Sequence, residues 1–108
     1  MSDNDFQQRY EAIMAKYHDY FEHVRTAFKS HCEEIKQKTM QRLKEVPEGD
    51  EEVKQQILME QKEELDQTLS ELKQLLNYQS AQMRKTLEDI RREQEAQNFS
   101  LEEELANL

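Results

Sequence analysis

The sequence predicts an all-α protein whose architecture is a long antiparallel helical hairpin of the coiled-coil type. Ala, Glu, Lys, Leu and Arg together supply 50 of the 108 residues, a proportion close to that of long helices and coiled coils. Apolar residues recur every three or four positions along two long stretches, as on amphipathic helices. The one Gly and the one Pro both fall within residues 47–49, where they would interrupt a helix.

The first helix is predicted at about residues 4–45. Its apolar residues follow steps of three and four, which place them on one face of a nearly straight helix. Ser2 or Asp3 can cap its start, and basic residues near its end suit the helix dipole. The apolar stripe consists of Phe6, Tyr10, Ile13, Tyr17, Tyr20, Phe21, Val24, Phe28, Cys32, Ile35, Leu43 and Val46.

A turn is predicted at residues 46–50, with the sequence VPEGD. Pro47 cannot continue a helix, and Gly49 can adopt a positive φ angle. Asp50 is a favourable N-cap, and it is followed by two glutamates that suit the first turn of a helix. A connection this short favours antiparallel packing of the helices on either side.

The second helix is predicted at about residues 51–97. A heptad seam runs along it, centred on Leu65, Leu69, Leu72 and Leu76, and polar residues at Lys62, Gln79 and Thr86 interrupt this seam. Asn98 can end the helix, and Ser100 with Glu103 forms a capping box. Residues 98–108 are therefore expected to be a separate, short amphipathic tail with Leu101, Leu105 and Leu108 on one face. This tail either folds back or docks into another protein.

A two-helix hairpin has one seam, and the aromatic stripe of the first helix is wider than that seam requires. We therefore expect the hairpin to complete a multi-helix bundle by oligomerisation, either as a homodimer or with similar helices of another protein. Clustered aromatic side chains offer the largest buried area per residue. The expected partner interface comprises Tyr17, Tyr20, Phe21, Val24, Phe28, Leu65, Leu69, Leu72 and Leu76.

The formal net charge of −9 narrows the classes of partner and compartment. An acidic chain is poorly suited to nucleic acids and to anionic membranes. The excess of acids lies in residues 47–108, where it either keeps the helix soluble or docks a basic partner.

The sequence has no apolar run long enough to span a membrane. Its acidic start is unlike a secretory signal, and Cys32 is a lone cysteine. We expect a cytoplasmic protein, with the nucleus left open.

Few residues form patterns that are typical of metal-binding or catalytic sites. His18 with Glu22 and Asp19 with His23 are spaced four apart, so each pair shares a helix face as bundle metal ligands do. The second helix has no histidine, and solvated side chains explain these pairs better. Cys32 stands beside two glutamates that disfavour a thiolate, so a core role is expected. We expect no enzyme, metal, cofactor or small-molecule substrate.

The sequence as a whole favours a non-enzymatic protein–protein interaction module, a coiled-coil subunit of a homo- or hetero-oligomeric assembly. The alternative is a helical adaptor or chaperone that masks an amphipathic segment of a client protein, for which Met14, Met40, Met59 and Met83 would offer an adaptable surface. The sequence LKQLL at 72–76 resembles a groove-docking helix, but its leucines belong to the seam.

Overall fold

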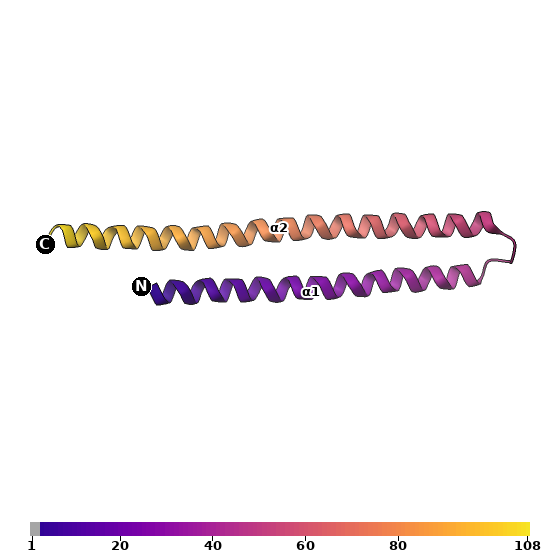
Figure 1. The fold of residues 1–108 in the computed structure, drawn as a ribbon, viewed down its shortest axis with the longest axis horizontal. Coiled ribbons are helices and arrows are strands. Elements are labelled where there is room, and N and C mark those ends of the chain that lie inside the picture. The colour runs from indigo at the N-terminus through magenta and orange to yellow at the C-terminus, as the bar shows by residue number, and fades with distance from the viewer. Residues whose placement is uncertain (1–2) are drawn as a thin grey trace. The chain divides into compact units, whose positions relative to one another are not determined.

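A computed structural model describes residues 3–108, and this part of the chain is an all-α helical hairpin with no strand. Helix α1 spans Asp3–Lys44 and helix α2 spans Glu51–Ala106 (Figure 1). The all-α hairpin predicted from the apolar spacing is confirmed. The predicted cap at Ser2 lies outside the described residues. Two compact units divide the chain, and each contains a part of both helices.

The unit formed by Glu22–Leu76, here called the turn unit, contains the end of α1, the connection and the first half of α2. Its buried apolar side chains are Ile35 and Ile57. Thr39 is also buried, and its hydroxyl donates a hydrogen bond of 2.9 Å to the backbone oxygen of Ile35. A polar residue is tolerated at this position because its own helix supplies the acceptor.

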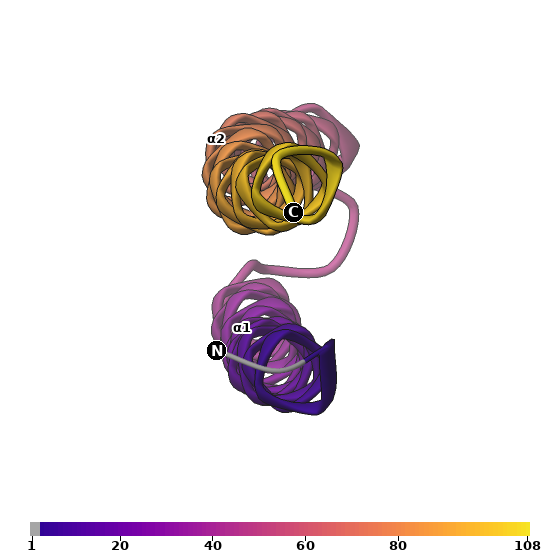
Figure 2. The same cartoon turned by 90° about the vertical axis from the view of Figure 1, so that its left-hand side faces the viewer.

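The connection between the helices forms where Pro47 and Gly49 predict it. Hydrogen bonds from the amides of Glu45 and Val46 to carbonyls three residues earlier close the end of α1. Gly49 has a φ of 90°, a conformation that costs a residue with a Cβ about 1–2 kcal/mol. The amide of Lys54 donates to the carbonyl of Asp50, which places Asp50 at the N-cap position. Figure 2 shows this segment passing from α1 to α2.

The second unit contains the described part of Met1–Phe21 together with Asn77–Leu108, and is here called the open unit. Phe6 and Ile90 are its buried apolar residues. Arg9 lies 5.7 Å from the ring centre of Phe6 and donates a hydrogen bond of 2.6 Å to Glu93. Because Arg9 is beside Glu93 and the helices are antiparallel, the start of α1 lies opposite α2 near residue 99. Within this unit α2 continues past α1 (Figure 1).

The predicted end of the second helix at Asn98 is wrong, because α2 continues without interruption to Ala106. The expected capping box at Ser100 therefore does not start a new helix. Asn and Ser cost a helix interior at most about 0.7 kcal/mol each relative to Ala. No Gly or Pro is present after Gly49, so extending the helix by one backbone hydrogen bond per residue outweighs that cost.

Candidate protein interaction site

Three of the aromatic residues expected at a partner interface come together in the open unit. Tyr17, Tyr20 and Phe21 are each half-buried. The ring centres of Tyr20 and Phe21 are 5.8 Å apart in an edge-to-face arrangement, and those of Tyr17 and Phe21 are 6.3 Å apart. Such pairs add about 0.5–1.5 kcal/mol to the burial of their surfaces. The rings therefore form one cluster on α1 that still exposes part of its surface.

The other two aromatic-stripe residues of the expected interface line a groove in the turn unit. Val24 and Phe28 of α1 lie there with Leu72 and Leu75 of α2, around a volume of about 310 Å³ that is open to solvent. Polar side chains of His23, His31 and Glu71 complete part of its lining. The groove has apolar walls and a polar edge, as sites that receive a helix or a side chain of another protein do.

A second apolar surface of the turn unit lies along α2 and comprises Leu58, Leu65, Leu69 and Leu76, here called the leucine flank. Leu58 is 42% exposed and Leu69 is 40% exposed, whereas their neighbour Ile57 is only 5% exposed. Consecutive helix residues differ by about 100° around the axis. Ile57 therefore faces α1, and the leucine flank lies at the edge of the contact. Leu65 and Leu76 are half-buried.

Leu69, which the sequence placed on the seam, is 40% exposed. The other leucines at the centre of the predicted seam, Leu65, Leu72 and Leu76, are half-buried. The polar residues Gln61 and Thr68 are half-buried as well. Long or hydroxylated polar side chains can occupy such positions when their polar ends reach water or a backbone carbonyl, and the hydroxyl of Thr68 donates to the carbonyl of Glu64. Leu75, which lines the groove, was not among the residues expected at the partner interface.

Ion pairs between the helices are few and exposed. Arg42 donates to Glu60 at 2.7 Å in the turn unit, as Arg9 does to Glu93 in the open unit. The hydrogen bond from Arg9 to Glu93 raises the pKa of the guanidinium above its ordinary value. Exposed pairs contribute little stability in water. Their main effect is to define which residues lie opposite one another.

The candidate metal-binding histidines, His18 and His23, have exposed side chains. Among residues 3–108, no three side chains of His, Cys, Asp or Glu are grouped in a way that could hold a metal ion. Cys32 is half-buried on the apolar stripe of α1. His31 lies 3.9 Å from Glu34, one helical turn away.

Neither described helix contains a segment that is long and apolar enough to cross a bilayer.

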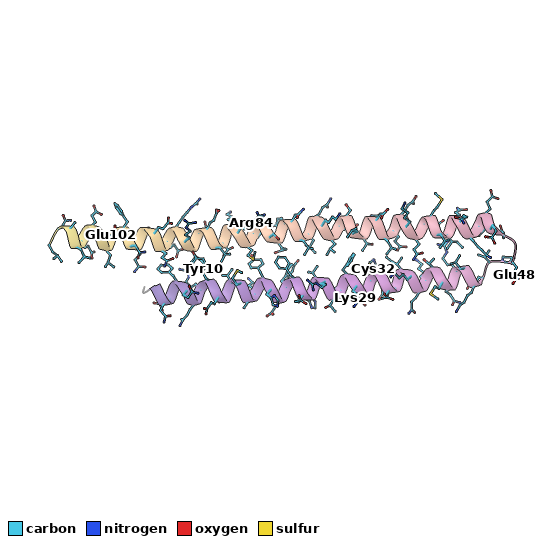
Figure 3. The ribbon with its side chains drawn as sticks, in the orientation of Figure 1. Tyr10, Lys29, Cys32, Glu48, Arg84 and Glu102 are labelled. Carbon is cyan, nitrogen blue, oxygen red and sulfur yellow. The ribbon has the colours of Figure 1, made fainter. Side chains whose placement is uncertain are left out.

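The candidate interaction surfaces are therefore the aromatic cluster in the open unit and, in the turn unit, the groove and the leucine flank. Figure 3 shows the side chains along both helices and labels Cys32 on α1 and Arg84 on α2. Comparison with protein families, characterised proteins and solved structures found none that matches this chain.

Proposed function

We propose that the protein is a non-enzymatic interaction module, a coiled-coil subunit that associates through helix packing with a second copy or with helices of another protein. The observation that carries this proposal is the imbalance between buried and exposed apolar residues. Among the described residues, four apolar side chains are buried and twelve large ones are exposed. Stable monomers expose single apolar residues, but continuous apolar surfaces usually mark interaction sites.

The total exposed area supports the same conclusion. The chain exposes 8808 Å², whereas a folded monomer of 13.1 kDa exposes about 6,400 Å². At about 25 cal/mol per Å² of apolar surface, covering even part of this difference would contribute many kcal/mol to association. The hairpin by itself therefore leaves exposed much apolar surface whose burial would stabilise an assembly.

The character of the surfaces favours association over catalysis. The groove is open to solvent and five of its nine lining residues are apolar, whereas active sites usually exclude water. We assign the protein to a reducing, cytoplasmic compartment because its single Cys32 provides no intrachain disulfide.

The test is the molar mass of the purified 108-residue chain in solution, measured by sedimentation equilibrium at low micromolar concentration. We expect a multiple of 13.1 kDa. Leu69→Asp and the equally exposed Leu75→Asp place a charge on the two sides of the helix contact, and at least one should reduce the mass to that of a monomer. Gln74→Asp, beside Leu75 on an exposed face, is the matched control and should leave the mass unchanged.

A thermally stable monomer with no associated chain would overturn the proposal. A monomer that becomes ordered only with a co-purified protein would instead support a client-masking adaptor. The exposure of Met14, Met40 and Met59 favours that second candidate, because methionine side chains adapt to varied apolar partners.

A further inference from the structure

One ion pair defines the register in which the two helices of the turn unit lie. Arg42 of α1 donates to Glu60 of α2 at 2.7 Å. Because the helices are antiparallel, a residue that precedes Arg42 by a given number of positions lies at the height of the residue that follows Glu60 by the same number. The groove agrees with this register, since Ala27 and Leu75 are equally far from that ion pair along the chain and both line the groove.

The edge of the groove on α1 carries basic groups. Lys38 and His31 precede Arg42 by four and by eleven positions, which is close to one turn and to three turns, so the three side chains share a face of α1. Glu34 also lies on this edge, 3.9 Å from His31. Lys38 is exposed, and among residues 3–108 it forms no ion pair.

The edge of the groove on α2 carries acids. Glu64 and Glu71 follow Glu60 by four and by eleven positions, so these three carboxylates share a face of α2, and Glu71 lines the groove. Lys62 and Lys73 are each two positions from one of these glutamates, which places both lysines on the opposite side of the helix. The α2 edge is therefore negative where the α1 edge is mainly positive.

The two edges match each other in charge, position by position. The residues at equal heights are Arg42 with Glu60, Lys38 with Glu64 and His31 with Glu71. Within the described part of one chain, only the first of these pairs forms an ion pair. Glu34 lies at the height of Thr68, a hydroxyl rather than a carboxylate. A partner that fits the groove must present acids over the α1 edge and bases over the α2 edge at the same spacing.

A second copy of the turn unit meets this requirement when it is turned by half a revolution about an axis parallel to the helices. That rotation places the α2 edge of each copy over the α1 edge of the other and leaves every residue at its own height. It also places Leu75, which is 40% exposed, over the small exposed side chain of Ala27. Every residue that defines this rotation lies within Glu22–Leu76.

Charge disfavours the other ways in which two copies could meet in the turn unit. A two-fold axis perpendicular to the helices would place one α2 edge on the other, so that glutamates would face glutamates. The leucine flank has no matched edges, since Lys62 and Lys73 lie beside it with Asp66 between them. The groove is thus the surface of the turn unit whose charges select a second copy.

We infer that the groove is a homodimer interface, in which the turn units of two copies pack face to face about a two-fold axis parallel to their helices. Lys38 of each copy pairs with Glu64 of the other, and His31 donates a hydrogen bond to Glu71 of the other, as histidine does in either protonation state. The contact is self-complementary and closes with two copies. This inference rests on the proposed function and names the partner as the same chain.

Charge reversal on one edge at a time tests the pairing between chains. H31E/K38E makes both edges mainly acidic and E64K/E71K makes both mainly basic, so each variant alone should dimerise with a dissociation constant raised about tenfold or more, measured by sedimentation equilibrium. An equimolar mixture of the two should form a heterodimer with a dissociation constant within about threefold of the unmodified value, because acids again lie over bases. Mixing would not restore ion pairs that lie within one chain.

Reversing both edges in the same chain identifies the axis. H31E/K38E/E64K/E71K should dimerise to within about threefold of the unmodified chain, since an axis parallel to the helices still places acids over bases. A perpendicular axis would leave like charges facing each other, and association would stay weak. K29E and E63K reverse exposed charges that lie off both edges. They are the matched controls and should leave the dissociation constant unchanged.

Cysteine crosslinking locates the contact on a C32S background. Chains that carry K38C and chains that carry E64C should form a mixed disulfide, because the two positions lie at one height on facing edges. E63C, which is rotated about 100° from the edge, should replace E64C poorly. Crosslinking of K38C chains to one another at the same yield would contradict the proposed axis.

The outcomes separate this inference from the proposed function. A dimer that persists in Leu75→Asp and in both edge variants, or a mixture that does not recover, overturns the groove interface and leaves helix association through another surface standing. A monomeric native protein overturns both. Recovery in the mixture and in the fully exchanged chain, together with the disulfide between K38C and E64C, establishes the interface.

Discussion

Two neighbouring residues, Ile57 and Leu58, have opposite environments although both are large and apolar. Ile57 is buried against α1, and Leu58 lies on the exposed leucine flank. About 100° of rotation separates them, so their energetic contributions identify which side of α2 faces its partner helix. A similar contrast holds between buried Thr39 and exposed Met40 on α1.

This contrast predicts different costs of truncation. Ile57→Ala should reduce the free energy of unfolding by about 2–4 kcal/mol, because it leaves a cavity as well as losing apolar burial. Leu58→Ala should cost about 1 kcal/mol or less when unfolding by urea is measured at the lowest usable protein concentration, where any oligomer has dissociated. Equal costs, or the reverse order, would mean that α2 is rotated relative to the arrangement described.

At the scale of the elements, the connection depends on one backbone conformation. The φ of 90° at Gly49 is unfavourable for residues with a Cβ, and a Cβ there would meet no other atom within 4 Å. Steric collision with the rest of the molecule therefore plays no part, and any cost of substitution comes from the backbone itself.

We expect Gly49→Ala to lower the free energy of unfolding by about 1–2 kcal/mol, as measured by urea denaturation. Gly49→Asn should cost clearly less, because asparagine tolerates positive φ better than alanine. Glu48→Ala, at an exposed position of the same turn, is the control and should change stability by less than about 0.5 kcal/mol. If all three variants were equally stable, the connection would not require this conformation.

At the scale of the whole molecule, stability should depend on how much of the exposed apolar surface is covered by another chain. Folding that is coupled to association is stabilised by mass action, so the melting temperature rises with protein concentration. A monomeric hairpin would melt at the same temperature at every concentration.

The melting temperature followed by circular dichroism should therefore rise by several degrees across a hundredfold range of protein concentration. For a variant that no longer associates, such as Leu75→Asp if the groove is the interface, the curve should be flat. A flat curve for the unmodified protein, with sharp melting at high temperature, would show that the hairpin is sufficient alone.

The sequence by itself determined the two helices and the turn between them, because these depend on local properties. Apolar steps of three and four favour helices at any position, and Pro47 and Gly49 interrupt a helix through their own backbone restrictions. Their positions in the chain required no knowledge of distant contacts. The predicted end of α2 at Asn98 is wrong, because the modest preference of Asn98 and Ser100 for helix ends does not outweigh helix propagation.

Only the tertiary structure decided which leucines of α2 lie at the edge of its contact with α1. Leu58 and Leu69 are more hydrophobic than Gln61 and Thr68, yet the polar pair lies nearer the contact and the leucines are exposed. The apolar period locates the buried face of a helix only approximately. The rotation of the helix about its axis depends on how the side chains of both helices pack against one another. The groove at Phe28 and Leu75 and the separate leucine flank result from that choice, since each side of the contact retains the apolar surface that the other helix does not cover.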